Sequence, residues 1–192
     1  MIMKIEDIYD IETDLVPKEL PILIYPNPNL HMESEDIIRF DDDENFHLTQ
    51  LFGDLALTMV RNNGIGISAP QVGILANMLV VLAELPGYSK PEPICIINPS
   101  IVEQDGEFEW EEGCLSVPGY YEKRIRSNRI VLQYQNLTGE DKELEARGLS
   151  AFAIQHEIDH LHGELFIDTL STLKKKFSVE KKIKNFLKKK QQ

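Results

Sequence analysis

The sequence predicts an α+β protein in which small antiparallel or mixed β-sheets pack around a central helix that carries an HExxH motif. One further helix precedes the strands and another closes the chain. Three observations predict this class. An apolar repeat at helical spacing lies at 41–64, short β-branched or alternating segments fill residues 76–147, and helical periodicity returns after residue 148. Strands followed by a helix, without βαβ alternation, are typical of α+β folds.

Local signals predict the elements of the first third. Residues 1–20 are expected to form an extension ahead of a domain at 21–172, which opens with the extended, proline-containing stretch LPILIYPNPNL. Segment 41–64 predicts a helix, because aspartates precede its apolar repeat and Asn63-Gly64 ends it. The repeating apolar residues are Leu48, Leu51, Phe52, Leu55 and Met59.

Four segments between residues 76 and 147 predict strands, because they are β-branched or alternating and are separated by glycine and proline. They read ANMLVVLAEL, PICIINPSIVEQ, GEFEWEEG and RIVLQYQNL. The stretch NLTGED, from Asn136 to Asp141, predicts a hairpin turn. Residues 148–162 then predict the central helix, and roughly 172–190 a last helix within a lysine-rich tail at 173–192.

Length and charge limit the classes of function. A chain of 192 residues fits one domain with a sizeable core. Residues 171–192 carry nine lysines and one glutamate, whereas residues 1–170 carry 11 basic and 31 acidic side chains. The acidic body argues against a broad nucleic-acid surface, while the basic tail permits a local contact with phosphates.

Cysteine content and hydropathy indicate the compartment. The two cysteines, Cys95 and Cys114, are too few for a disulfide framework. No apolar run approaches the ~20 residues of a membrane span. The acidic N-terminus has neither the apolar core of a signal peptide nor the basic character of a transit peptide. We therefore expect a soluble cytoplasmic protein that makes no contact with a membrane.

The segment QHEIDH predicts metal chemistry. His156 and His160 are four residues apart, so on a helix both imidazoles leave the same face and can bind one metal ion. Glu157, about 100° around the axis, can reach a water molecule on that ion without being a ligand. The alternative is a polar helix turn whose histidines find other partners. The metal site is favoured because Phe152 and Ala153 share the histidines' face and direct them inward.

A catalytic site of this kind needs a third protein ligand and an open position for water. Downstream candidates are Glu164 and Asp168, of which Glu164 is too close along the same helix. Cys114 is the better candidate, because a thiolate is a strong ligand for iron or zinc and its setting is acidic and glycine-flanked. Cys95, in an apolar run, is expected to be a buried free cysteine, and His162, off the helix stripe, to be exposed.

Three motifs together are similar to those of the peptide deformylase family. They are Glu111-Glu112-Gly113-Cys114-Leu115-Ser116, the segment QHEIDH, and GIGISAPQ at 64–71, which resembles the family's GxGxAAPQ. Ser68 departs from that pattern, in which alanine is usual. Three motifs in the family's order are jointly specific. The resemblance covers about residues 20–175, and the lysine tail only loosely.

The resemblance implies a role for each motif. The metal ligands are Cys114, His156 and His160, and Glu157 is the general acid/base. Gln71 and the backbone N–H of Leu115 stabilise the oxyanion, and the backbone of Gly66 contributes to substrate binding. The cofactor is one divalent metal ion, ferrous iron, which zinc, nickel or cobalt readily replaces. The implied reaction removes formate from the N-formylmethionine of newly made polypeptides.

General chemistry agrees with these roles. Amide hydrolysis needs an activated water, a stabilised oxyanion and a proton for the leaving amine. A metal ion lowers the pKa of bound water from ~15.7 toward ~7, and Glu157 can carry that water's proton to the departing nitrogen. Two other functions stay open. A zincin endopeptidase would take its third ligand downstream, and a deformylase fold without activity would bind peptides or the ribosome.

Apolar residues near the motifs predict a substrate pocket. Leu149, Phe152 and Ala153 lie on the stripe that carries the ligands, and the other motifs add Ile65 and Trp110. Together they would form a pocket sized for a methionine side chain. The alternative is that these residues are plain core.

Two further expectations concern charged residues. Arg126 is expected to pair with Asp159 or Glu112 and so to orient the metal ligands, the alternative being a solvated surface residue. The lysine tail is expected to form a basic amphipathic helix that contacts ribosomal RNA, the alternative being a helix that only docks on the body. Its apolar residues at near-helical spacing are Phe177, Ile183, Phe186 and Leu187.

Overall fold

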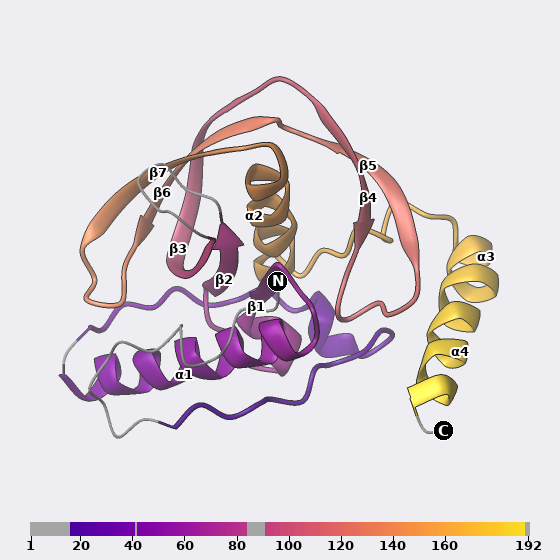
Figure 1. The fold of residues 1–192 in the computed structure, drawn as a ribbon, viewed down its shortest axis with the longest axis horizontal. Helices are drawn as coiled ribbons and strands as arrows, with labels where there is room; N and C mark the ends of the chain where they lie inside the picture. Colours follow the sequence, from indigo (N-terminus) through magenta and orange to yellow (C-terminus); the bar gives the residue numbers. More distant parts are fainter. Residues whose placement is uncertain (1–15, 41, 84–90, 191–192) are drawn as a thin grey trace.

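The computed structural model describes residues 16–40, 42–83 and 91–190, and it confirms the α+β class (Figure 1). Helix α1 (Asp42–Arg61) precedes the strands of the described chain, and helix α2 (Gly148–Leu161) follows them. The chain ends with α3 (Thr172–Lys174) and α4 (Glu180–Lys190). Short 3₁₀ helices lie at η2 (Pro28–His31) and η3 (Ala69–Val72). The expected N-terminal extension falls largely on residues 1–15, outside the described part of the chain.

Two antiparallel sheets lie on either side of α2 (Figure 1). The larger sheet has the strand order β1-β2-β3-β6-β7, and all its neighbouring strands are antiparallel. The smaller sheet pairs β4 with β5. The strands are β1 (Gly66–Ser68), β2 (Met78–Ala83), β3 (Glu92–Asp105), β4 (Phe108–Gly113), β5 (Tyr121–Arg126), β6 (Arg129–Gln135) and β7 (Asp141–Arg147).

Four of these strands, β2, β3, β4 and β6, coincide with the predicted segments. The predicted turn is also confirmed, since the Asn136 N–H donates to the Glu140 carbonyl (3.0 Å) between β6 and β7. The sequence pattern does not predict β1, β5 or β7. Strands β5 (YEKRIR) and β7 (DKELEAR) carry charged side chains that hide the period-2 signal, and β1 has only three residues.

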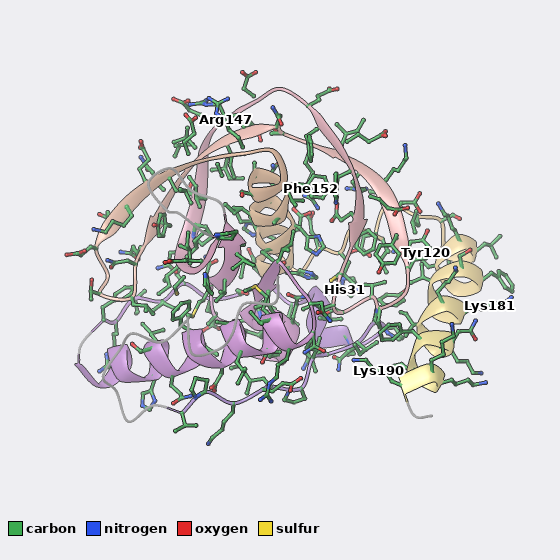
Figure 2. The ribbon with its side chains drawn as sticks, viewed as in Figure 1. His31, Tyr120, Arg147, Phe152, Lys181 and Lys190 are labelled. Atoms are coloured by element: carbon green, nitrogen blue, oxygen red, sulfur yellow. The ribbon has the colours of Figure 1, made fainter. Side chains whose placement is uncertain are left out.

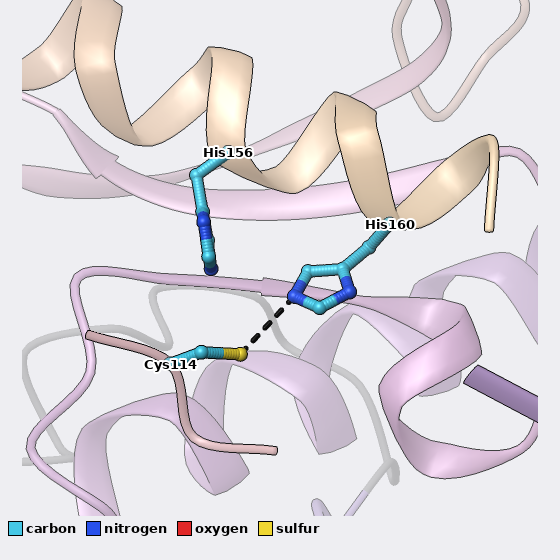
Figure 3. Close-up of side chains that lie close together, drawn as sticks. All are labelled: Cys114, His156 and His160. Atoms are coloured by element: carbon cyan, nitrogen blue, oxygen red, sulfur yellow. Dashed lines mark hydrogen bonds between the residues drawn. The ribbon is translucent and has the colours of Figure 1, made fainter. Parts of the chain in front are cut away.

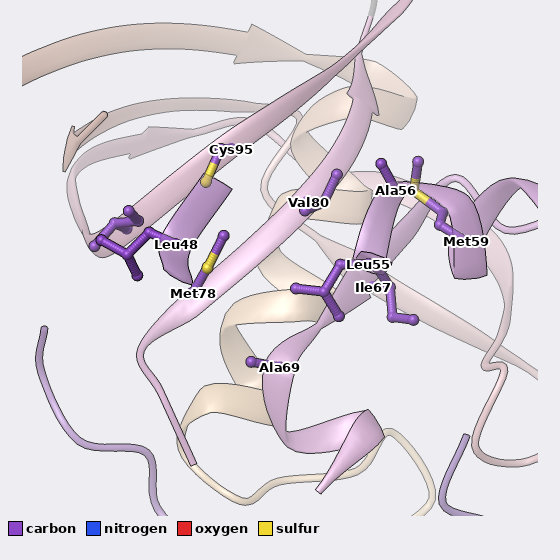
Figure 4. Packing of buried hydrophobic residues seen from close by; sticks show 10 residues of the cluster. Leu48, Leu55, Ala56, Met59, Ile67, Ala69, Met78, Val80 and Cys95 are labelled. Atoms are coloured by element: carbon purple, nitrogen blue, oxygen red, sulfur yellow. The ribbon is translucent and has the colours of Figure 1, made fainter. Parts of the chain in front are cut away.

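The first hydrophobic core lies between α1 and the larger sheet (Figure 4). Leu55 and Met59 of α1 are fully buried against Ile67 of β1 and Met78 of β2, which confirms the predicted apolar face of the helix. Cys95 of β3 belongs to the same cluster and is the buried free cysteine that the sequence predicts. Burial raises the pKa of its thiol well above the ordinary value, so Cys95 is a packing residue.

Helix α2 is buried on nearly all sides. Gly148, with a φ of 55°, takes the left-handed conformation that leads the chain from β7 directly into the helix. Ala151 and Ile154 pack against the larger sheet. His156 and His160 are also buried, as the apolar stripe predicts. A helix in this position cannot solvate its polar side chains, so those side chains need partners within the protein or a bound ion.

The C-terminal helical region docks on a further core cluster. Val179 and Ile183 are buried in this cluster together with Tyr120, which lies beside α4 in Figure 2. The helix predicted for roughly 172–190 is confirmed, with a π-helical turn at Lys175–Val179 between α3 and α4. The spacing of Phe177 predicts that it lies on the apolar face of this helix. It is instead 66% exposed and lies outside the docking face. In the described part of the chain, no helix has the length and apolar character needed to cross a membrane.

Candidate metal centre

Cys114, His156 and His160 meet around one point (Figure 3). Cys114 directly follows β4, and the two histidines stand on successive turns of α2. The thiol sulfur and the ring nitrogens lie within 4.8 Å of one another, and Cys114 Sγ is 3.2 Å from His160 Nε2. The ligands of a tetrahedral zinc-like ion lie roughly 3.5 Å apart. The three side chains therefore have the spacing and the donor types that a divalent transition metal requires.

The downstream candidates for a third ligand lie elsewhere. Asp168 accepts a backbone hydrogen bond (2.8 Å) and pairs with Lys175 (2.9 Å). Glu164 is exposed, and so, as predicted, is His162. Among the residues that the structure describes, the group suited to a metal ion is Cys114 with the two histidines. This is not the arrangement of a zincin, so that alternative is wrong.

A buried chain of hydrogen bonds orients His156. Its Nδ1 is hydrogen-bonded to the Glu112 carboxylate, which in turn accepts two bonds from Arg126 (3.1 and 2.7 Å). Arg126 also donates to Asp159 (2.7 Å). The predicted pairing is confirmed, and Arg126 contacts both carboxylates rather than one. Because Nδ1 of His156 is engaged, its Nε2 is the nitrogen left to bind a metal ion.

The same contacts keep this buried group of residues charged. Burial would raise the pKa of Glu112, but hydrogen bonds from His156 and Arg126 outweigh it and lower that pKa to about 2. Burial likewise opposes the charge of Arg126, but Glu112 and Asp159 raise its pKa above the ordinary value. The Arg126 guanidinium also lies 5.3 Å from the centre of the Phe152 ring. Loss of one partner would leave an uncompensated buried charge, which is strongly destabilising.

The protonation chemistry of the two histidines fits a metal site. Burial lowers the pKa of His160 well below its usual value, so its ring is neutral, as a ligand must be. For His156 burial acts in the same direction, but hydrogen bonds to Cys114 and Glu112 outweigh it and raise the pKa. Metal binding displaces such shared protons. Glu157 Oε2 is buried without a hydrogen-bond partner in the described structure, so the site can accept a further polar species beside it. His160 Nδ1 also lacks a partner among the described residues, but it lies on the ring edge away from Cys114 (Figure 3).

Glu157 lies beside the ligands with 3% of its surface exposed. Burial raises the pKa of its carboxyl group to about 7, although the charge of His156 and a hydrogen bond from Ser68 oppose the shift. A carboxyl group with a pKa near neutrality can both take up and release a proton. Gly66 provides the necessary space, because a Cβ atom there would lie 2.5 Å from Glu157 Oε1. A larger residue at this position would displace the carboxylate.

Gln71 is buried, and two serines orient its side-chain amide. The amide oxygen accepts hydrogen bonds from the N–H (2.9 Å) and the O–H (3.1 Å) of Ser68. The amide nitrogen then faces Cys114 Sγ (3.4 Å) and Ser116 Oγ (3.2 Å). Ser68, which departs from the family pattern, is therefore part of this arrangement. Ser116 lies within the EEGCLS motif, but no local pattern in the sequence marks it as a partner of Gln71.

A cavity of about 920 Å³ leads to the ligands. Its walls contain each of the residues expected to bind substrate, which are Ile65, Gly66, Trp110, Leu149 and Phe152. Leu115, in the loop after β4, lines the same cavity. Ile65, Trp110 and Leu149 are 42%, 48% and 40% exposed, so the alternative of plain core is wrong for these three. Phe152 is buried, and the Phe108 ring lies between it and Trp110. The structure thus brings these apolar side chains to one cavity beside the ligands.

The cavity extends further than the sequence analysis predicts. Residues 19–22, 24 and 61–64 line it, as do Phe186, Leu187 and Lys190 of α4. No local pattern marks these residues, because segments so distant in sequence come together only through tertiary packing.

Comparisons with known proteins agree with this geometry. A family model described as polypeptide deformylase matches residues 19–176. The peptide deformylase of Wolinella succinogenes is 44% identical over 167 residues, covering 86% of this chain and 95% of the relative. That of Campylobacter jejuni is 45% identical over 175 residues, covering 88% and 98%.

Solved structures show the same similarity. A peptide deformylase from Legionella pneumophila has a TM-score of 0.79 at 35% identity, and the match covers 91% of this chain and 99% of the other. One from Ehrlichia chaffeensis, in complex with actinonin, has a TM-score of 0.76 at 37% identity, and the match covers 87% and 97%.

Replacement of Arg126 by alanine is expected to weaken metal binding about 10- to 100-fold, because Glu112 is then buried without its cation and no longer held against His156. A competition titration with a coloured chelator measures the affinity, and the melting temperature is recorded beside it. Lys123→Ala, which removes an exposed cation from the same strand, is the matched control and should change neither quantity. An Arg126→Ala protein with unaltered affinity and melting temperature would show that these contacts do not orient the ligands.

Replacement of Glu157 by glutamine is expected to stabilise the metal-free protein at about pH 8 by about 3–4 kcal/mol. The pKa of this carboxyl group rises from about 4.3 in the unfolded chain to about 7 in the folded protein. The folded state therefore binds the extra proton, and stability is lost as the pH rises through this interval. Glutamine avoids that loss, so its advantage should vanish below about pH 4.

Urea unfolding of chelator-treated protein across this pH range measures the effect. Glu164→Gln, at an exposed position, is the control and should leave stability unchanged. A stability difference between Glu157→Gln and the unmutated protein that does not depend on pH would contradict the raised pKa.

Proposed function

This chain belongs to the polypeptide deformylase family, and on that basis we propose a role for each residue of its metal centre. The protein is a metal-dependent peptide deformylase, a hydrolase that removes the formyl group from the N-terminal formylmethionine of polypeptides. One observation carries this function. Cys114 meets His156 and His160 beside the buried carboxyl group of Glu157.

Glu157 carries the proton of the reaction. When bound, the metal ion supplies the Lewis acidity that activates a water molecule. Glu157 takes up the proton that this water loses as it attacks the formyl carbon, and then gives it to the departing amine nitrogen. Its pKa of about 7 supports both transfers, and Gly66 leaves room for the carboxylate beside the cavity. Formate and a free amino terminus are the products.

Gln71 and the backbone N–H of Leu115 donate to the formyl oxygen as it becomes negatively charged. The orientation of the Gln71 amide supports this role, because Ser68 occupies its oxygen and turns its nitrogen toward Cys114. Leu115 follows Cys114 and lines the cavity. Fixed donors of this kind require no reorganisation during the reaction, and the loss of one costs about 10²–10³ in rate.

Ferrous iron is the native metal ion in this proposal, with zinc, nickel or cobalt as substitutes. Iron and zinc both accept a thiolate with two imidazoles. The negative charge of the Cys114 thiolate makes the bound ion a weaker Lewis acid than a neutral third ligand would. A formyl carbon, which carries only a hydrogen atom, is sterically open and tolerates the weaker activation.

The organisation of the chain follows from the same proposal. Residues 21–172 form the catalytic domain, preceded by the extension at 1–20 and followed by the lysine-rich region at 173–192. The match of the family model to residues 19–176 supports the central boundaries. The substrates are nascent chains, so the protein acts in the cytoplasm where these chains are made.

Formate release from a formyl-Met peptide tests the proposal. Anaerobically prepared, iron-loaded protein should release formate, and Glu157→Gln should keep its metal but lose about 10²–10⁴ in kcat. Cys114→Ala should lose both metal and activity, whereas Cys95→Ala, at the buried free cysteine, should keep both. Absence of formate from metal-loaded protein would favour a fold that binds peptides without hydrolysing them. Activity retained by Cys114→Ala would show that another residue completes the site.

Replacement of Phe152 by alanine is expected to reduce the preference for formyl-Met over formyl-Ala peptides by about 10-fold or more. The side chain forms a buried part of the apolar wall that we assign to the methionine side chain. The ratio of kcat/KM for the two peptides is the measurement, because it is independent of the fraction of folded enzyme. Equal kcat/KM values for both peptides in the unmutated enzyme would refute the pocket.

The lysine-rich region contacts ribosomal RNA while the enzyme acts on nascent chains. Its support is the row of exposed lysines on α4, opposite the face that packs Ile183 into the body. Replacement of Lys181, Lys184 and Lys188 by glutamate should weaken co-sedimentation with ribosomes and flatten its salt dependence. The same three changes should leave the release of formate from a free peptide intact. Unaltered co-sedimentation with ribosomes at low salt would show that α4 only packs on the body of the protein.

A further inference from the structure

The cavity has an inner and an outer part. The inner part surrounds the ligands and the apolar side chains that we assign to methionine. The outer part is lined by residues 19–22 and 24, 61–64 and 119–121, together with Phe186, Leu187 and Lys190 of α4. A formylated methionine fills only the inner part. The residues that follow methionine in a polypeptide substrate must extend across the outer part, whose residues take no part in the reaction described above.

Helix α4 is held firmly in the wall of the outer part. Gly119, with a φ of 77°, lets the loop after β4 approach the helix so closely that a Cβ atom there would lie 3.3 Å from Phe186 Cβ. Lys174 donates to Glu122 (2.7 Å), and Tyr120 is hydrogen-bonded to the same carboxylate. These contacts join the C-terminal region to the β5 side of the cavity. The helix therefore offers a fixed surface to whatever crosses it.

The end of α4 places a cation at the rim. Lys190 Nζ lies 5.5 Å from the centre of the Phe186 ring, a contact that positions the ammonium group while both side chains line the cavity. Figure 2 shows Lys190 at the C-terminal end of α4, away from Lys181 near its beginning. The aromatic ring and the ammonium group thus form one apolar and one charged contact point for a passing peptide.

The other charges of the cavity wall are of both signs. Glu19 pairs with Arg61 (3.2 Å), whereas Glu111 lies opposite Lys123 in the β4–β5 pair but Lys123 pairs with Glu109 (2.7 Å). Lys190 makes no ion pair with the residues that the structure describes, so its ammonium group is a local positive charge at the α4 edge of the cavity. An acidic side chain on the substrate would be attracted there, and a basic one repelled.

We propose that α4 forms the part of the substrate groove that receives the residues after the formylated methionine, and that Lys190 there favours an acidic side chain. This inference rests on the proposed function. It assigns the inward edge of α4 to substrate selection, whereas the outward lysines of the same helix face away from the groove.

The test compares the kcat/KM of formate release for peptides of the form formyl-Met-Ala-Xaa-Ala, with glutamate, glutamine or lysine at Xaa. A second set moves Xaa by one position in each direction. At low salt the unmutated enzyme should favour glutamate over lysine about threefold at one of the positions. The preference should fade toward one as the salt concentration approaches ~1 M. Lys190→Glu should reverse it, and Lys190→Gln should abolish it.

Lys184→Glu is the matched control, because it makes the same change of charge on the same helix at an exposed residue outside the cavity wall. It should leave the preference as it is in the unmutated enzyme. The inference is overturned if the unmutated enzyme shows no preference at any position, or if both substitutions change it equally. A protein that releases no formate even from the glutamine peptide overturns the proposed function itself, which is a separate outcome.

Discussion

The contact of Arg126 with two carboxylates holds the metal centre together. Glu112 stands near the end of β4, just before the loop that carries Cys114, and Asp159 stands on α2 between His156 and His160. Arg126 thus ties the smaller sheet to the central helix. Its side chain is 8% exposed, so water screens the attraction only weakly. Metal ligation tolerates deviations of about 0.2 Å, so a small displacement of the sheet would separate the sulfur from the ring nitrogens.

The burial of α2 explains why polar groups gather there in such number. The polar side chains of a surface helix would point to solvent, whereas those of the buried helix α2 must find hydrogen-bond partners within the protein. Gln155 does so through the backbone of Ser127, and His156 through Glu112. Glu157 and His160 each keep one buried atom without a partner, and these two residues lie at the metal centre. The helix is fully paired except where the chemistry takes place, as expected of a functional site in a consistent fold.

The periodicity of apolar residues in the sequence predicts the elements that have one apolar face. It does not predict the strands that carry charged side chains on both faces. The repeat that includes Leu55 and Met59 predicts α1, and the alternating segments predict β2, β3, β4 and β6. Strands β5 and β7 are not predicted because charged side chains stand on both of their faces, in β5 at exposed and half-buried positions alike. Strand β5 forms by pairing with β4, and β7 forms by pairing with β6. The sequence pattern within one strand does not reveal such pairing. The docking of α4 could not be predicted from the sequence for the same reason, since Ile183 packs on residues far away in the chain.

The sequence by itself determined which donors exist and how two of them are arranged. The spacing of His156 and His160 is a local property of the helix, and the motifs around Cys114 and Gln71 point to one family. Only the tertiary structure decided that Cys114 reaches His160 across 46 residues, that Arg126 binds both carboxylates at once, and that α4 closes one side of the cavity. Helical periodicity acts over a few residues and can be read from the chain. Contacts between distant segments depend on how whole elements pack, so they become visible only in the folded protein.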